Sequence, residues 1–214
     1  MHIPDGYVDL PLAALFAALS LAVLSYAARR VGGTISDTRA PLVGVVAAGV
    51  FAAQMLNWPI PGGTSAHFVG GAFAAILLGP HLGALAVATV VAVQALVFGD
   101  GGLVVLGANV FNMAVVEVYV GYAVYRAVAP YGEFRAAFAA GWLGITAGAL
   151  TAGLQLGLSS AFQYELLTTL AIMGVGHLVL GLIEGAITAV VYRYLARARP
   201  DLRPTTAPEP EVSA

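Results

Sequence analysis

The sequence predicts an all-α, polytopic membrane bundle of about seven transmembrane helices, with the N-terminus outside and the C-terminus in the cytoplasm. Three observations support this prediction: the apolar composition, the lengths of the apolar stretches and the positions of the arginines. Of the 214 residues, 60% are hydrophobic and 9% are charged, and the mean hydropathy is +0.89. Soluble domains carry about 25% charged residues, so a bilayer is the expected surrounding of this chain.

Six apolar stretches follow one another along the chain. They cover residues 10–28, 41–56, 66–98, 103–125, 136–158 and 166–192. Most are close to the ~20 residues that a helix needs to cross about 30 Å of hydrocarbon. The third stretch is too long for one span, and Gly79, Pro80 and His81 interrupt it. This interruption predicts two helices joined by a turn.

The basic residues set the predicted orientation. The chain contains no lysine, and its arginines are Arg29, Arg30, Arg39, Arg126, Arg135, Arg193, Arg197, Arg199 and Arg203. They follow the first, fourth and last stretches, whereas the loops at 57–65, 99–102 and 159–165 contain none. Arginine-bearing loops stay in the cytoplasm, so the first two arginine-free loops both lie outside. The third stretch must then cross twice, which brings the count to seven.

The N-terminal segment and the C-terminal segment differ in whether they belong to the predicted bundle. Residues 25–27 (SYA) resemble a signal-peptide cleavage site, and cleavage there would remove the N-terminus. Signal peptides begin with basic residues, however, whereas this chain has Asp5 and Asp9 there, so we expect the first segment to be retained. Residues 1–198 are predicted to form one transmembrane metal-binding domain. Residues 199–214 are polar and proline-rich, which predicts a disordered cytoplasmic tail.

Composition also excludes several classes of function. The chain has no cysteine, so disulfides and thiolate metal sites are excluded. Without lysine it cannot contain the Gly-Lys-Ser/Thr of a nucleotide-binding P-loop. The net charge of -2 gives no sign of nucleic-acid binding. No nucleophile, base and acid are grouped as in a hydrolase, so we do not expect the chain to be an enzyme by itself.

The first residues, MHIPDG at positions 1–6, are the most informative motif. The Met1 amine, the deprotonated His2 amide nitrogen and His2 Nδ1 form two fused chelate rings around one ion. Planar nitrogen coordination of this kind suits Ni(II) and Cu(II), and Co(II) less strictly. The competing interpretation is a histidine that lies in solvent near the chain terminus.

A second motif supplies a candidate for the fourth nitrogen. The outer loop reads PGGTSAH at residues 61–67 and ends in His67, with Asn57, Thr64 and Ser65 as nearby polar groups that could orient an imidazole. The segment that follows, 67–79, is short and contains two glycines, a pattern typical of binding sites in membrane proteins. Asp5 could screen the positive charge that a bound divalent ion retains. Here too the alternative is a solvated interfacial histidine.

Other polar residues fall within or near the spans. His81 is expected to be solvated or to cap a helix, and His177 is expected to bridge helices by hydrogen bonds. Gln155, Asn109 and Asn112 are assigned the same bridging role. Two acidic residues, Glu117 and Glu184, lie toward the cytoplasmic side of their spans, where ionisable groups are costly. Their role is left open between pairing, proton movement and contact with a partner.

The two motifs together resemble the CbiM/NikM family, the substrate-binding membrane subunits of nickel/cobalt energy-coupling-factor (ECF) transporters. The resemblance covers nearly all of residues 1–197. It implies a seven-helix subunit whose N-terminus folds into the site, with Met1, His2 and His67 as the metal ligands. The family loop often reads Ser-Gly-His where this chain has Ser-Ala-His at residues 65–67, which leaves the ligands in place.

The same resemblance implies partners. A transmembrane coupling subunit and two ATPase subunits would drive the transport, with small accessory membrane subunits as a further option, in the inner membrane of a prokaryotic cell. Small residues spaced four apart permit close helix contact in lipid. We assign the face formed by Gly44, Ala48 and Ala52 to the coupling subunit, and internal packing is the alternative.

The sequence therefore favours a subunit that captures Ni(II) as a transported substrate, with Co(II) uptake for cobalamin synthesis as the alternative. A rival from another class is an electron-transfer membrane protein with haem between His67 and His177. That rival requires both imidazoles at similar depth, and the predicted spans place His67 near the outer edge and His177 near a span centre. A third hypothesis is an assembly protein that binds no ligand.

Overall fold

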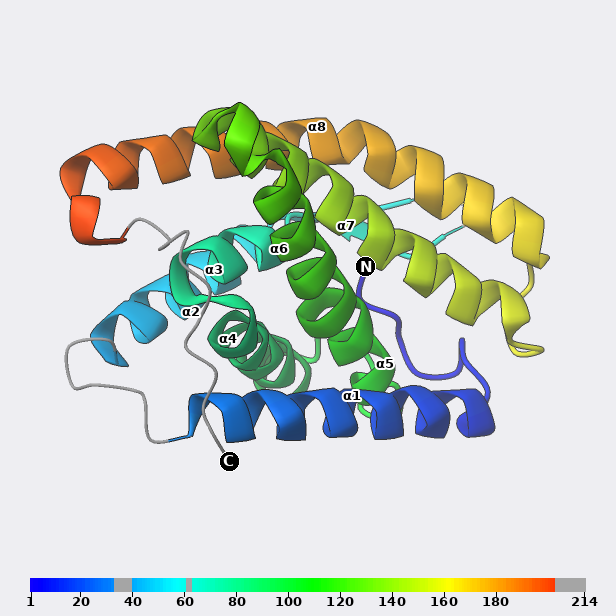
Figure 1. The fold of residues 1–214 in the computed structure, drawn as a ribbon. Helices are drawn as coiled ribbons and strands as arrows, with labels where there is room; N and C mark the ends of the chain where they lie inside the picture. Colours follow the sequence, from blue (N-terminus) through cyan, green and yellow to red (C-terminus); the bar gives the residue numbers. More distant parts are fainter. Residues whose placement is uncertain (33–39, 61–62, 203–214) are drawn as a thin grey trace.

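Two long helices and a bundle of shorter ones make up most of the chain. The structure is a computed structural model that describes residues 1–32, 40–60 and 63–202. In Figure 1, α7 (Glu133–Leu158) and α8 (Leu166–Ala198) run side by side along one side, and α1 (Leu10–Val31) lies along the opposite side. The shorter helices fill the space between these two layers.

The helices coincide with the predicted apolar stretches. The second stretch is α2 (Ala40–Gln54), and the third divides into α3 (Gly71–Leu78) and α4 (Pro80–Val93). The fourth stretch holds α5 (Leu106–Val110) and α6 (Glu117–Val128). Wider π-helical turns continue α4 over Gln94–Phe98 and join α5 to α6 over Phe111–Val116. Short 3-10 turns lie at Ala129–Tyr131 and Pro200–Leu202.

The turn predicted between α3 and α4 is confirmed. Gly79 has a φ of +82°, a backbone conformation that glycine adopts readily. Pro80 then opens α4, because its missing N–H is no loss at the first position of a helix. The two residues thus end one helix and begin the next.

A short β-hairpin departs from the all-α prediction. Strands β1 (Asn57–Pro59) and β2 (Ser65–His67) pair antiparallel, with Asn57 opposite His67. Three-residue strands give too few positions for an alternating pattern to stand out in the sequence. The hairpin fixes the position of the loop that carries His67.

Length and composition identify part of the predicted membrane topology. In the described part of the chain, four helices are long and apolar enough to span a bilayer: Leu10–Val31, Pro80–Phe98, Glu133–Leu158 and Leu166–Ala198. Helix α2 has 15 residues and α3 has 8, fewer than a straight span needs. The count of seven and the orientation of the termini therefore stay predictions. Most of the predicted tail, residues 203–214, lies outside the described residues.

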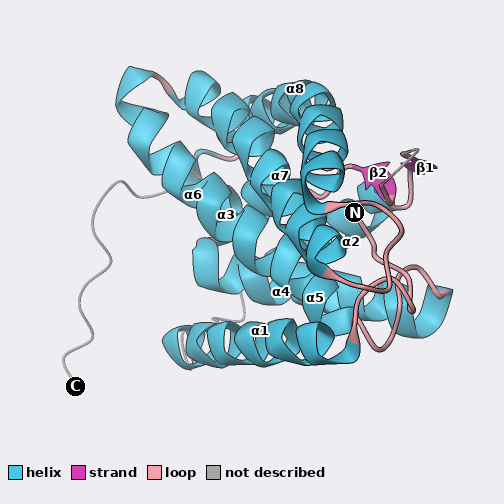
Figure 2. Cartoon of the chain, turned by 90° about the vertical axis from the view of Figure 1, so that its right-hand side faces the viewer, coloured by secondary structure: helices cyan, strands magenta, loops and turns pink. Residues whose placement is uncertain are grey.

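The N-terminus lies inside the fold. Met1 and Ile3 have no exposed surface and belong to the main hydrophobic core. Figure 2 shows the N-terminus beside β2, where the loops gather along one side of the helices. Charged chain termini normally lie at the surface, so this burial indicates a specific role for the first residues.

Candidate metal centre

The Met1 amine is held by the loop that precedes His67. It donates hydrogen bonds to the Ser65 carbonyl oxygen and, over 3.0 Å, to Ser65 Oγ. The Met1 side chain packs against α7, where a Cβ added at Gly148 would lie 3.3 Å from Met1 Cε. The structure thus brings together two predicted site residues that lie 64 positions apart in the sequence.

Ile3 is fixed by hydrogen bonds to Asn109 of α5 and to Gly102 in the segment before α5. Asn109 clamps Ile3 from both sides: its Oδ1 accepts from the Ile3 N–H over 2.8 Å, and its Nδ2 donates to the Ile3 carbonyl over 3.0 Å. The Gly102 N–H also donates to the Ile3 carbonyl, over 2.9 Å. This clamp differs from the helix-bridging role expected for Asn109.

Asp5 has a structural role at the same place. Its carboxylate accepts hydrogen bonds from the backbone N–H groups of Leu103, Val104 and Val105, over 2.9 to 3.3 Å. These groups precede α5, and a carboxylate is stabilising at a helix N-terminus. Asp5 therefore anchors the N-terminal peptide, and both of its carboxylate oxygens accept from these backbone N–H groups.

The two predicted ligand imidazoles lie face to face. The rings of His2 and His67 are stacked, with centroids 4.6 Å apart and planes 19° from parallel. His2 is 4% exposed and His67 is fully buried. The predicted site therefore comes together in the interior, and both imidazoles are shielded from water, contrary to the solvated alternative.

Hydrogen bonds decide which nitrogen of each ring stays free. His2 Nε2 lies 3.2 Å from Gln94 Oε1, and His67 Nδ1 lies 2.8 Å from the Phe68 carbonyl. Both oxygens are acceptors, so these nitrogens carry the protons. His2 Nδ1 and His67 Nε2 then hold lone pairs, and neither has a hydrogen-bond partner among the described residues. These are the two imidazole nitrogens that the predicted chelate requires.

Burial favours the neutral form of the Met1 amine and of the His2 and His67 imidazoles. Desolvation lowers the pKa of the Met1 amine to about 4, although Asp100 and Glu117 oppose the shift. Desolvation, reinforced by the nearby amine, lowers the pKa of His2 to about 3, and the same two causes lower that of His67 well below its usual range. Metal ligands must be deprotonated, and these nitrogens are already so at neutral pH.

Asp100 is the carboxylate that faces the histidines. Its Oδ1 lies 3.5 Å from His2 Nδ1, and Asn57 Nδ2 lies 3.4 Å from its other oxygen. Burial raises the pKa of Asp100. Asn57 therefore contacts the site through Asp100, while Thr64 Oγ1 is buried without a partner among the residues described.

Two buried carboxyl groups support the loop behind His67. Glu184 on α8 accepts from the N–H groups of Val69 and Gly70, over 3.0 and 2.9 Å. Glu117 on α6 accepts from the Gly71 N–H over 2.8 Å. Both carboxyl groups thus bind the backbone where α3 begins, a role that differs from the pairing, proton movement and partner contact left open for them.

Other polar residues differ in how well their roles were predicted. Asn112 and Gln155 exchange two side-chain hydrogen bonds of 2.8 Å between helical segments, which confirms the predicted bridge. His81 lies 2.8 Å from Tyr119 Oη and contacts the Tyr26 ring edge-on, so it is packed between aromatic rings.

The side chain of His177 differs from its expected role. Its Nδ1 lies 2.9 Å from the Met173 carbonyl of its own helix, so it does not bridge helices. It lies close enough to His67 to influence the pKa of that residue. Strand β2, which ends in His67, contacts α8, the helix that carries His177, and the depth of the two residues in a membrane stays a prediction.

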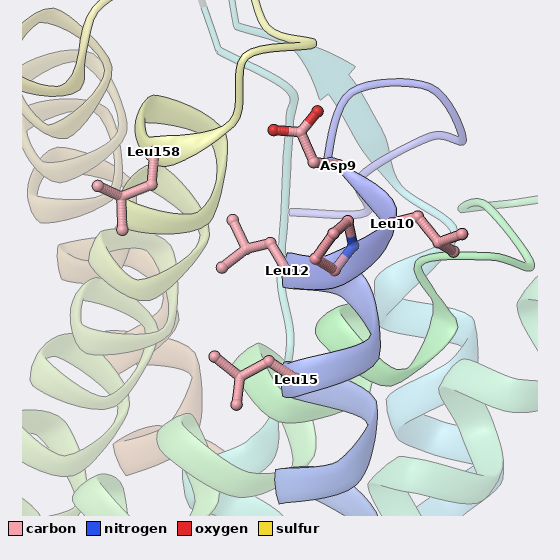
Figure 3. A pocket seen from close by; sticks show the side chains of 6 residues that line it. Asp9, Leu10, Leu12, Leu15 and Leu158 are labelled. Carbon is pink, nitrogen blue, oxygen red and sulfur yellow. The ribbon is translucent and has the colours of Figure 1, made fainter.

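An open groove elsewhere offers no second set of ligands. It lies between the start of α1 and the end of α7 and is lined by Asp9, Leu10, Pro11, Leu12, Leu15 and Leu158 (Figure 3). The one carboxylate, Asp9, already accepts hydrogen bonds from the N–H and hydroxyl of Ser160, over 2.7 and 3.1 Å. The face predicted to meet a partner, Gly44, Ala48 and Ala52, is exposed on α2.

Sequence reasoning missed Gln94 and Asp100. Gln94 is a buried amide at the end of an apolar stretch, and Asp100 is an acid in an arginine-free outer loop. A buried polar group within a span is costly, which was the available signal for Gln94, whereas an acid in a loop such as Asp100 gives no signal. Their contacts with His2, 92 and 98 positions away, could not be predicted from the sequence.

Known proteins resemble this chain over nearly its full length. The family model described as "Cobalt uptake substrate-specific transmembrane region" matches residues 2–202. The "Putative fused nickel transport protein NikMN" of Archaeoglobus fulgidus is 59% identical over 202 residues, which are 94% of this chain and 68% of that protein. The "Putative metal transport protein" of Haloquadratum walsbyi is 60% identical over 202 residues, 94% of this chain and 93% of that protein.

A solved structure has the same fold. The crystal structure of a truncated transition metal transporter superposes with a TM-score of 0.89 at 35% identity, and covers 92% of this chain and 99% of that one. The family match covers nearly the full length of the chain, and these relatives are named as metal transport proteins. The chain belongs to the CbiM family and is a multi-pass membrane protein.

Proposed function

We propose that this chain captures Ni(II) as a transported substrate on the outer side of a prokaryotic membrane, with Co(II) as the alternative ion. One observation carries the proposal: the buried Met1 amine, His2 and His67 lie together, and the free imidazole lone pairs have no other partner among the residues described. Four nitrogens would hold the ion: the Met1 amine, the His2 amide, His2 Nδ1 and His67 Nε2.

The chemistry of these donors favours Ni(II) over the common hard cations. Mg(II) and Ca(II) prefer oxygen ligands, whereas nitrogen donors in a plane suit Ni(II). Binding through the amide requires loss of its proton, which leaves one net positive charge on the bound ion. Asp100, 3.5 Å from His2 Nδ1, is the carboxylate placed to balance that charge, in place of Asp5.

The arrangement of His2 and Asp100 also supports the binding of a cation between them. His2 Nδ1 and Asp100 Oδ1 are 3.5 Å apart, and two acceptors without a proton between them repel. A cation bound to Nδ1 would turn this repulsion into attraction. The cost of the buried, unpaired lone pairs is then offset when the substrate arrives.

Transport itself requires other chains. We propose that the chain has seven spans with the N-terminus outside, and that a transmembrane coupling subunit and two ATPase subunits drive it. Small accessory membrane subunits and lipid are the other expected contacts. The exposed face of Gly44, Ala48 and Ala52 on α2 would allow a partner helix to approach closely.

Three histidine variants test the capture proposal. We expect His2→Ala and His67→Ala each to weaken Ni(II) binding by at least about 100-fold, because each removes a direct ligand. His81→Ala is the matched control, because this histidine contacts Tyr119 and Tyr26 instead. Titration of the purified variants with Ni(II) measures the effect. Unchanged affinity in both ligand variants would favour an assembly protein without a ligand.

A further inference from the structure

His177 is a buried imidazole whose second nitrogen the proposed four-nitrogen site leaves unused. It lies on α8 with no exposed surface. Its Nδ1 donates to the Met173 carbonyl over 2.9 Å, so its Nε2 holds a lone pair. This Nε2 has no hydrogen-bond partner in the described ranges. A backbone carbonyl that fixes the tautomer in this way is typical of metal-ligating histidines.

The position of His177 connects it to the proposed site. Strand β2, which ends in His67, lies against α8. One turn before His177, Met173 packs on the same hairpin, since a Cβ added at Gly63 would lie 2.8 Å from Met173 Sδ. Burial, the N-terminal amine and His2 are the main causes that lower the pKa of His67, and His177 is a further one. His177 therefore lies on the helix that β2, and with it the loop of the proposed site, contacts.

A nearby free donor matters for the rate at which a planar Ni(II) site exchanges its ion. Ligand substitution at planar Ni(II) is associative: a fifth ligand binds before one of the four leaves. In a buried site, water reaches the ion poorly, so a protein side chain must be the entering ligand. A neutral imidazole with an unused lone pair is suited to this step.

We propose that His177 Nε2 is the entering ligand that begins the exchange of the captured ion at the four-nitrogen site. This inference rests on the proposed function. The Ni–Nε2 bond to His177 forms and the Ni–Nε2 bond to His67 breaks, because His67 is the one ligand outside the chelate rings. Both imidazoles are neutral, so no proton or electron moves. The ion keeps its three bonds to Met1 and His2 during this exchange and leaves the site when these bonds break in turn.

The role of His177 is tested by comparing the rates of Ni(II) binding and release with the Kd for Ni(II). For His177→Ala we expect the binding and release rates of Ni(II) to fall together, by about tenfold, with an unchanged Kd. Stopped-flow mixing with Ni(II), and release into excess chelator, give the two rates. A static fifth ligand would instead weaken Kd, and a structural histidine would speed release by loosening the site. Either result would overturn the proposal.

Rescue by free imidazole and a second variant of His177 complete the test. Free imidazole should restore the rates in His177→Ala by entering the space left by the side chain, and should leave the rates of the unmodified protein and of His81→Ala unchanged. His177→Gln, which fills that space without an imidazole, should be as slow as the alanine variant and covers the case that alanine impairs folding. Failure of the proposed function is seen separately, as full Ni(II) affinity in His67→Ala.

Discussion

Gln94 determines which nitrogen of His2 is free to bind a metal. Its Oε1 accepts from His2 Nε2 over 3.2 Å, so the lone pair is left on Nδ1. Only Nδ1 can close a six-membered chelate ring with the His2 amide. A single buried amide therefore selects the useful tautomer of a histidine that belongs to a distant part of the chain.

We expect Gln94→Leu to weaken Ni(II) binding by about 10- to 100-fold, the usual cost of losing a group that orients a metal ligand. The side chains are similar in size, so the helix should stay folded. Gln94→Glu keeps an acceptor oxygen and should retain most of the affinity. Isothermal titration of both variants measures the effect, and wild-type affinity in Gln94→Leu would show that the hydrogen bond to His2 is dispensable.

At the scale of elements, the N-terminal peptide is held by the loop between α4 and α5. Gly102 contacts it most closely, because a Cβ at this position would lie 2.4 Å from the Asp5 backbone nitrogen. That distance is too short for any side chain, so the peptide or the loop has to move.

We expect Gly102→Ala to displace the peptide and weaken Ni(II) binding by at least about tenfold, since overpacking costs about 1–3 kcal/mol. Gly49→Ala is the matched control, because a Cβ there meets no atom within 4 Å. Hydrogen exchange at residues 2–8, compared between the two variants, reports the displacement. Equal protection in both would contradict the role given to this loop.

The elements also show what the sequence could predict. The apolar stretches matched the helices, and Gly79 with Pro80 marked the turn between α3 and α4, because both signals are local. The hairpin was missed, and so was the contact of β2, which ends in His67, with α8. These features depend on contacts with α6 and α8, where Glu117 and Glu184 bind the backbone after His67. Such contacts leave no local pattern.

At the scale of the whole molecule, the fold places a chain terminus in its own core and keeps it uncharged. Burial lowers the pKa of the Met1 amine from its usual 8.0 to about 4 and that of His2 from 6.5 to about 3. Protons therefore compete with the metal at these groups only in strong acid.

We expect binding to release about one proton per Ni(II) between pH 5.5 and 8, the one from the His2 amide. The affinity should then fall about tenfold per pH unit as the pH is lowered through this range. With ordinary pKa values the amine would add to the release below about pH 8 and the imidazoles below about pH 6.5, and the slope would steepen at each of these points. Calorimetry in buffers of different ionisation enthalpy counts the protons, and release of three near pH 6 would contradict the neutral, buried site.

The central claim is that the first residue of the chain binds the ion through its own amine. The most direct measurement is Ni(II) titration of one sample before and after a protease removes an N-terminal extension and frees Met1. We expect no high-affinity binding with the extension in place and full binding after cleavage, while an extension at the C-terminus has no effect. High-affinity binding by the uncleaved protein would contradict the account.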